Sequence, residues 1–399
     1  MRCLSSFPVQ SYREGATVFY APDVSLYSER GSYIPSKAPV FYNPKMSLNR
    51  DVTVCVLQAY SEEAGRKLRV CVPMAGCGVR ALRFMLETDS VESIVVNDIN
   101  PAAFSLIKKN FELHGLKDRA FICCEDANTL LSSFASKGDR FDLVDLDPFG
   151  SPAPFLESAV RALKPKSAML CITATDLPLL CGSQPRACLR RYGSMPFKGE
   201  YCHEVALRIL IAHAVSVAAK HDYALQPALS YYFGHHVRVY FKGRLGAKMA
   251  DEKLEKIGYL VHCDHCLSRR LIRGLPAPDI TRRCPECGKE TRIAGPVWCG
   301  PLQNEDFLRR VVKVAERKIE KEETLELLAQ LLEEANAPPL YYEIHRMCSA
   351  ARVPCPPIEK VIEALRGMGF SAFRTHFSAI SVKTDAPPMK LLALLREFV

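Results

Sequence analysis

The chain has 399 residues, of which 48% are hydrophobic and 24% are charged, and its formal net charge is +9 at pH 7. This composition excludes a disordered or fibrous chain, and the length predicts two or three globular domains. The longest apolar segment, residues 205–219, is too short to span a bilayer, so we expect no membrane partner.

Seventeen cysteines occur in a chain whose first 15 residues lack the continuous apolar run of an export signal. We therefore expect a cytoplasmic protein, in a reducing compartment where thiols are free to bind metal.

The positive charge is concentrated in the middle of the chain. Residues 151–243 contain 11 Lys/Arg against 5 Asp/Glu, a balance of +6, and residues 244–299 contain 11 against 7, a balance of +4. A basic zone beside a reactive site favours a polyanionic substrate such as a nucleic acid. An ordinary solvated surface produces a bias of the same size.

From residue 67 the pattern alternates between strands and helices, after a Tyr-, Pro- and Ser-rich segment. That segment, residues 1–60, is predicted to be an N-terminal extension. The predicted strands are 70–72, 93–96, 120–124, 141–146 and 167–175, with helices at 101–114, 128–136 and 153–163. This alternation predicts an α/β fold with a parallel sheet and right-handed crossovers.

The second half of the chain has a different pattern. We predict a loop at 182–199, a helix at 200–221 and an antiparallel edge hairpin formed by 228–233 and 236–241. The expected domains are an α/β domain at 61–243, a loop-rich ribbon at 244–303 and an α/β C-terminal domain at 304–399. In the last of these, helices are expected up to residue 335 and a β-hairpin at 371–383.

A glycine loop follows the first strand of the alternation. Residues 76–81 read GCGVRA, and Asp98 follows about twenty residues later. Gly76, Gly78 and Asp98 match the dinucleotide fingerprint, in which the acid binds an adenosine ribose. The pattern suits NAD and S-adenosylmethionine equally. Asp126 and Ala127 offer an adenine contact, although Asp126 is equally well placed to cap a helix.

The sequence DLDPFGSP, at residues 145–152, favours S-adenosylmethionine over NAD. Asp147 can accept a hydrogen bond from an exocyclic N–H, the Pro148 carbonyl can accept a second, and Phe149 offers a stacking face. Methylation of an amino group on a base needs such a clamp, because the nitrogen lone pair is delocalised into the ring. Hydride transfer does not need it. An ordinary Asp-Pro turn is the alternative, and Asp145 is expected to be structural.

Two Cys-x-x-Cys pairs lie in the basic zone. Cys263 and Cys266 are separated by 17 residues from Cys284 and Cys287, a spacing typical of a structural zinc site with four thiolates. Disulfides are the alternative that a reducing compartment disfavours, and a neighbouring histidine, His262 or His265, could replace one ligand.

These motifs together resemble the tRNA (guanine-N2-)-dimethyltransferases, which methylate the guanine at position 26 of tRNA. The resemblance covers nearly the whole chain. It rests on Glu14-Gly15, Phe41-Tyr42-Asn43-Pro44, Asn49-Arg50-Asp51, the glycine loop, Asn97-Asp98, residues 145–152, the cysteine pairs and residues 295–302.

The resemblance implies a Rossmann-like class I methyltransferase that transfers one and then a second methyl group from S-adenosylmethionine to N2 of that guanine. It implies that the target guanine lies at Asp147 and Pro148. The implied cofactor-binding residues are Phe41, Arg50, Arg80, Asp98, Asp126 and Ala127. The resemblance also implies that residues 1–60 pack on the donor pocket, that 61–243 are the catalytic domain, that 244–303 are the zinc-binding ribbon and that 304–399 are the tRNA-recognition domain.

Arg186, Arg190, Arg191 and Lys198 are candidate phosphate contacts for tRNA, or members of an ordinary solvated loop. No obligate protein partner is evident. Three alternatives stay open: an aminomethyltransferase for DNA adenine or cytosine, an NAD-dependent oxidoreductase, and a non-catalytic RNA-binding module. A methyl-transfer assay on RNA and DNA separates the first, and a thermal shift with NADH or S-adenosylhomocysteine separates the second.

Overall fold

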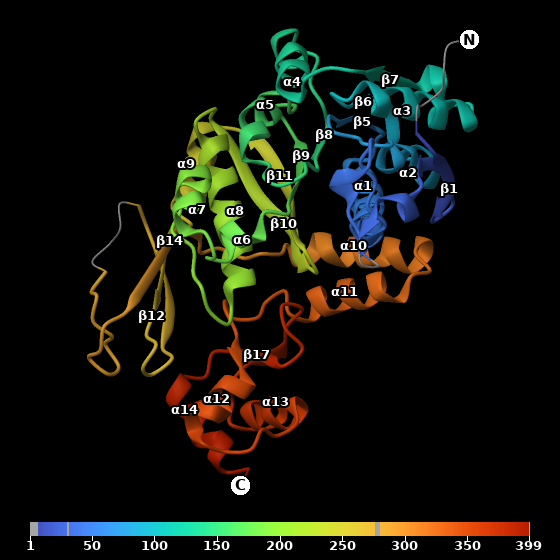
Figure 1. Cartoon of the computed structure of the whole chain (residues 1–399). Helices are drawn as coiled ribbons and strands as arrows, with labels where there is room; N and C mark the ends of the chain where they lie inside the picture. The colour runs from blue at the N-terminus through green and yellow to red at the C-terminus, as the bar shows by residue number, and fades with distance from the viewer. Residues whose placement is uncertain (1–6, 30–31, 276–279, 399) are drawn as a thin grey trace. The chain divides into compact units, whose positions relative to one another are not determined.

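The computed structural model describes residues 7–29, 32–275 and 280–398. The chain divides into two compact units, which are described separately. The first consists of residues 1–148, 154–172 and 309–326, and the second of 149–153, 173–308 and 327–399 (Figure 1).

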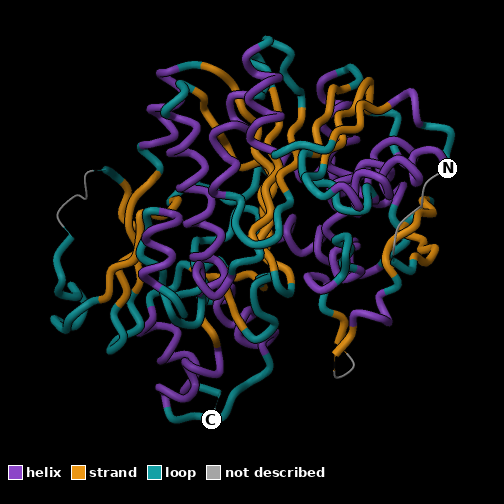
Figure 2. Tube along the Cα trace, turned by 45° about the horizontal axis from the view of Figure 1, so that its top comes forward, coloured by secondary structure: helices purple, strands orange, loops and turns teal. Residues whose placement is uncertain are grey.

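The central sheet is mostly parallel, as predicted. Its strand order is β10-β11-β9-β8-β5-β6-β7, and all pairs among the last five strands are parallel (Figure 2, strands in orange). These five are β5 (Leu68–Val72), β6 (Val91–Asn97), β7 (Ala120–Cys123), β8 (Leu143–Leu146) and β9 (Ala168–Ala174). Every residue of β8 and β9 is buried, which explains why all of them except Asp145 and Thr173 are apolar.

Helices follow these strands where local capping signals place them. They are α2 (Val79–Glu87), α3 (Pro101–Leu113), α4 (Ala127–Ser136) and α5 (Leu156–Arg161). The Asn100 side chain accepts a hydrogen bond from the Ala102 amide, and Pro101 occupies the first position of α3. Because β5, β6 and β8 are parallel, their carboxyl ends lie at one edge of the sheet.

The N-terminal segment is more ordered than its composition suggests. β1 (Val9–Glu14) and β2 (Thr17–Pro22) form an antiparallel hairpin, and α1 (Ser47–Ala64) follows. The sequence gives no helical prediction for α1, because almost every side of this helix is buried and the amphipathic signal is lost. Asn110 of α3 holds the hairpin: it accepts from the Tyr20 amide at 2.7 Å and donates to the Tyr20 carbonyl at 2.8 Å.

In the second unit, the predicted loop at 182–199 contains a helix, so that prediction is wrong in part. α7 (Pro185–Tyr192) has proline at its first position and ends at Gly193 in the left-handed conformation. Both are helix-boundary signals. α6 (Leu177–Leu180) precedes it, and α8 (Cys202–Ala219), the β10 (Tyr223–Phe233) and β11 (His236–Leu245) hairpin and α9 (Ala247–Leu254) follow.

α8 is longer than the apolar segment predicted from the sequence. By length and composition it could cross a membrane, contrary to the expectation that this segment is too short. However, 67% of its apolar window is buried inside the fold, and its charged pair Glu204 and Arg208 lies in that buried part. Burial of this kind is typical of a core helix.

The rest of the second unit contains two small sheets. β12 (Ile257–His262) lies between β13 (Arg269–Arg273) and β14 (Arg292–Trp298) in an antiparallel sheet next to the paired cysteines. The helices predicted up to residue 335 are α10 (Glu305–Lys318) and α11 (Glu322–Glu333), parts of which belong to the first unit.

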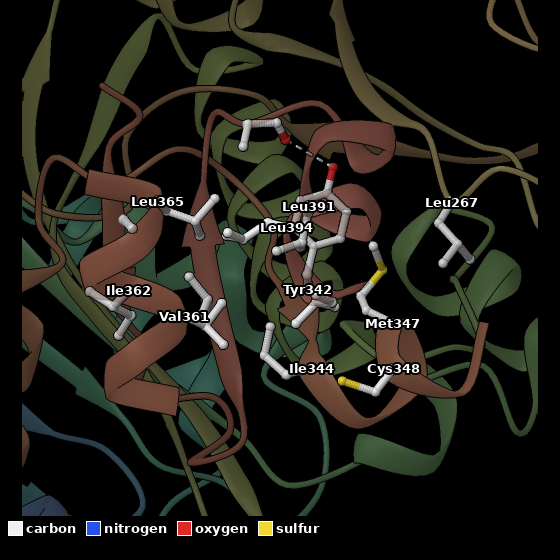
Figure 3. Packing of buried hydrophobic residues seen from close by; sticks show 14 residues of the cluster. Leu267, Tyr342, Ile344, Met347, Cys348, Val361, Ile362, Leu365, Leu391 and Leu394 are labelled. Atoms are coloured by element: carbon white, nitrogen blue, oxygen red, sulfur yellow. Dashed lines mark hydrogen bonds between the residues drawn. The ribbon is translucent and has the colours of Figure 1, made fainter. Parts of the chain in front are cut away.

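The C-terminal part has its own core. It comprises α12 (Ile344–Ala351), α13 (Ile358–Gly367), α14 (Pro388–Arg396) and a sheet of β15 (Tyr342–Glu343), β17 (Ser381–Thr384) and β16 (Ala372–Arg374). Figure 3 shows Val361, Leu365, Leu391 and Leu394 of this core among its other apolar side chains. The predicted hairpin at 371–383 corresponds to β16 and β17.

Candidate active site

The glycine loop forms one wall of a pocket in the first unit. Gly76 has φ +56°, and a Cβ atom added there would lie 2.5 Å from the Phe41 carbonyl oxygen. The Cys77 amide donates to the same oxygen at 3.3 Å. Gly78, at φ +85°, begins α2. Both glycines are therefore required by the backbone conformation, and Gly76 also by the close approach of the chain around Phe41.

Asp98 lies behind this loop. Its Oδ2 accepts a hydrogen bond from the Gly76 amide at 2.8 Å, and its Oδ1 accepts from the Asn100 amide at 3.0 Å. Burial raises the pKa of Asp98, and the two amides oppose that shift. The acid predicted from the sequence thus fixes the conformation of the glycine loop.

Arg80 and Asp147 are joined by an ion pair. Arg80, at the start of α2, donates through Nη2 to Asp147 Oδ2 at the carboxyl end of β8 and to Asn49 Oδ1 at 2.9 Å, and through Nη1 to Thr53 Oγ1 at 3.0 Å. Asp145 is fully buried, with its Oδ2 3.7 Å from Arg80 Nη1. Arg80 therefore orients the carboxylate that the sequence indicated as the proton acceptor.

Arg50 is held by a partner that the sequence analysis did not identify as a site residue. Its Nε and Nη2 donate to the two carboxylate oxygens of Glu14 at 2.6 and 2.5 Å, and Tyr42 Oη donates to the same carboxylate at 3.0 Å. Burial disfavours the charge of Glu14, but Arg50 and then Arg83 lower its pKa. The signal available in the sequence was the acid of the Glu14-Gly15 turn.

One pocket collects most of these groups. The predicted residues Phe41, Arg50, Gly76, Arg80 and Asp147 line it. Its other lining residues are Tyr42, Asn43, Met74, Ala75, Cys77 and Val79.

Four other predicted cofactor residues do not line this pocket: Gly78, Asp98, Asp126 and Ala127. Gly78 turns the chain into α2, and Ala127 is buried in the first turn of α4. Asp126 is exposed, and its Oδ1 accepts from the Thr129 amide at 2.9 Å. Asp126 therefore caps α4, one of the two roles considered for it.

Pro148 and Phe149 follow Asp147 directly. Pro148 is buried, whereas Phe149 is 74% exposed and is the first residue of the second unit's segment. The next turn is fixed within that unit, because the Gly150 amide donates to Thr175 Oγ1 at 2.9 Å and Ser151 Oγ bonds Tyr192 Oη at 2.7 Å. An aromatic ring of this exposure offers a stacking surface for a base.

A larger cavity, of about 880 Å³, also lies in the first unit. Ion-paired side chains line much of it, including Glu14, Asp51, Arg83 and Glu87. It contains neither the glycine loop nor Asp147. We therefore assign the site to the smaller pocket, which contains both the glycine loop and Asp147.

The four predicted metal ligands come together in the second unit. The sulfur atoms of Cys263, Cys266, Cys284 and Cys287 all lie within 4.8 Å of one another, and two of the pairs are 3.5 Å apart. Thiolates at about 2.3 Å from a tetrahedral zinc ion would be separated by about 3.8 Å, so the cluster fits that ion. His262 points elsewhere, since its Nδ1 bonds Tyr201 Oη at 2.6 Å.

The four candidate phosphate contacts are all exposed. Arg186, Arg190 and Arg191 lie on α7, and Lys198 lies between α7 and α8. Among the ion pairs formed by the described residues, Arg191 is the one member of these four with a carboxylate partner. Its Nη1 lies 3.5 Å from Asp176 Oδ2. The α7 segment therefore presents several positive charges to solvent.

The chain is similar to known proteins over most of its length. The family described as N2,N2-dimethylguanosine tRNA methyltransferase matches residues 15–396. A tRNA (guanine(26)-N(2))-dimethyltransferase of Methanobrevibacter smithii is 37% identical over 98% of each chain. An Aquifex aeolicus relative named tRNA (guanine(26)-N(2)/guanine(27)-N(2))-dimethyltransferase is 35% identical over 88% of each. Among solved structures, Trm1 from Pyrococcus horikoshii with S-adenosyl-L-methionine has a TM-score of 0.83 and 34% identity, covering 96% of this chain and 99% of its own.

Proposed function

Because the chain belongs to the N2,N2-dimethylguanosine tRNA methyltransferase family, we propose that it transfers two methyl groups in turn from S-adenosylmethionine to N2 of a tRNA guanine. The observation that carries the proposal is the position of Asp147, which lines the same pocket as the glycine loop. A proton acceptor for the base and the expected donor loop thus share one site. The DNA and NAD alternatives are not favoured, since the relatives named above act on tRNA.

We propose that Phe41, Arg50, Gly76 and Arg80 form the donor side of the pocket, with Asp98 holding the loop behind it. S-adenosylmethionine supplies an electrophilic methyl group on a sulfonium. Gly78, Asp126 and Ala127 would contribute through the backbone turns that they fix.

Asp147 provides the acid–base chemistry. Its carboxylate accepts an N2–H hydrogen bond of the guanine, which draws the nitrogen lone pair out of the ring and toward the methyl group. The new N–C bond forms as the methyl–sulfur bond breaks, and the N2 proton leaves through Asp147. The monomethylated amine keeps one N–H, so the same carboxylate serves the second transfer.

The remaining residues bind the base and the RNA. The Pro148 carbonyl would accept a second hydrogen bond, and Phe149 would stack on the base after it leaves the RNA helix, at a cost of a few kcal/mol. Arg186, Arg190, Arg191 and Lys198 would contact phosphates. The cysteine cluster is proposed to hold a structural zinc ion, because four protein thiolates leave no open position.

The domain roles expected from the sequence and the cytoplasmic location are part of the same proposal. The N-terminal extension is proposed to complete the donor pocket, and residues 304–399 to bind tRNA. The exposed basic helix α7 lies outside residues 304–399, so the proposed RNA contacts are not confined to that C-terminal domain.

The test is incubation with S-adenosylmethionine and an unmodified tRNA transcript, followed by nucleoside mass spectrometry. Dimethylguanosine should form with wild-type protein and disappear with Asp147→Ala, while binding of S-adenosylhomocysteine is retained. Transcripts in which guanine 26 or guanine 27 is replaced identify the target. A fully active Asp147→Ala enzyme would refute the role of this carboxylate.

A further inference from the structure

A second group of metal-binding side chains lies in the second unit, outside the Cys-x-x-Cys pairs. The ligand atoms of Cys181, Cys202 and His203 all lie within 4.8 Å of one another, and each residue is partly accessible. Cys181 ends α6, where its amide donates to the Leu177 carbonyl at 2.7 Å. Cys202 and His203 are the first two residues of α8. Two helix ends thus converge on one point.

The chemistry of the three ligands selects a class of ion. Two thiolates and a neutral imidazole suit zinc and other soft or borderline ions, and no carboxylate belongs to the group, which disfavours magnesium and calcium. Three protein ligands leave one tetrahedral position for water. Binding would release the two thiol protons to solvent.

The imidazole is already oriented by its surroundings. The ring of His203 stacks on Tyr232 of β10, with centroids 3.9 Å apart and planes 9° apart. A ligand held in one orientation loses little freedom when the ion binds, which favours binding at this point. The neighbouring Cys188 is fully buried on α7 and is not a member of the ligand group, so it offers a matched control.

We propose that Cys181, Cys202 and His203 bind a zinc ion that fastens the two ends of residues 182–201 together. This segment carries α7 and its exposed arginines Arg186, Arg190 and Arg191. A crosslink at the ends of a chain segment removes conformational freedom from everything between them. The ion therefore orders a basic surface without contacting it.

The first test measures zinc content by mass spectrometry in protein purified under reducing conditions and supplied with Zn²⁺. Cys181→Ser and His203→Gln should each contain one zinc ion fewer per chain than wild type, and Cys188→Ser should match wild type. The comparison is a difference between variants, so it does not depend on occupancy of the four-cysteine cluster. Equal zinc content in wild type and Cys181→Ser, in folded protein by circular dichroism, would overturn the proposal. So would an intact-protein mass showing a Cys181–Cys202 disulfide.

The second test follows trypsin cleavage after the three arginines. Cys181→Ser should be cut there several-fold faster than wild type and Cys188→Ser, with cleavage elsewhere unchanged. His203→Gln serves the same purpose if Cys181→Ser does not fold. Equal cleavage rates in a variant that has lost its zinc would show that the ion does not order the segment. Neither readout requires methyl transfer, so these results are independent of the proposed activity.

Discussion

Arg80 is the side chain whose removal should separate stability and catalysis most clearly. It is 4% exposed, and it forms ion pairs with both Asp145 and Asp147 in the first unit. Arg80→Met keeps most of the side-chain volume and removes the charge. Asp145, which is completely buried, then loses the positive charge that lies 3.7 Å from its Oδ2. Breaking a buried pair by removing one partner costs about 3–5 kcal/mol, so the free energy of unfolding should fall by that amount.

Catalysis should fall as well, because Asp147 loses the donor that orients it. A misplaced general base costs about 10²–10⁴ in rate. Adding Asp145→Asn to Arg80→Met should restore part of the stability, since the buried negative charge is gone, but not the methyl-transfer rate. The assays are urea unfolding by circular dichroism and single-turnover methyl transfer to tRNA.

An exposed ion pair of the same unit supplies the control. Lys117 lies 3.3 Å from Glu112, and both side chains are more than half exposed. Lys117→Met should change the unfolding free energy by less than about 1 kcal/mol and leave the rate unchanged. The reasoning is refuted if Arg80→Met unfolds at the same urea concentration as Lys117→Met, or if the double variant recovers full activity.

Two further outcomes are expected. Gly76→Ala places a Cβ atom 2.5 Å from the Phe41 carbonyl, so affinity for S-adenosylhomocysteine in calorimetry should fall at least about tenfold, or about 1.4 kcal/mol. Gly65→Ala is the control, with similar positive φ but nothing within 4 Å of the new atom, and affinity there should not change. In the second unit, burial alone would raise the pKa of Glu334, but His376 and Lys383 lower it to about 2. Its ionised form therefore stabilises the fold above about pH 4.5, and this contribution is lost as the pH falls toward 2. Glu334→Gln should remove that part of the acid dependence of the thermal midpoint, and an unchanged dependence would contradict this assignment.

The alternation of strands and helices was predictable because β8 and β9 are mostly apolar and because Asn100 and Pro101 mark a helix start. α1 was not predictable in the same way. It buries charged and polar residues, among them Asn49, Arg50 and Asp51, so its buried face does not look hydrophobic. Such a helix becomes recognisable only when the partners of those side chains are known.

The same limit applies to the site. Asp147, Arg80 and the glycine loop were each visible as motifs, and in the structure Gly76, Arg80 and Asp147 line one pocket. The link between Arg80 and Asp147 joins residues 67 positions apart, and the link between Glu14 and Arg50 joins residues 36 apart. Pairings at such separations leave no local pattern. For Asp126, sequence allowed two roles, and the hydrogen bond to the Thr129 amide supports the cap.

The Glu14–Arg50 pair has a consequence for how the protein could be shortened. A chain trimmed to begin after β2 would keep every residue of the glycine loop and Asp147. It would nevertheless leave the guanidinium of Arg50, 5% exposed, without its carboxylate partner. The trimmed protein would have to hydrate that charge by opening the wall of the pocket that Arg50 lines. The hairpin is thus an inseparable part of the enzyme's minimal unit, and fragments intended for ligand screening should retain it.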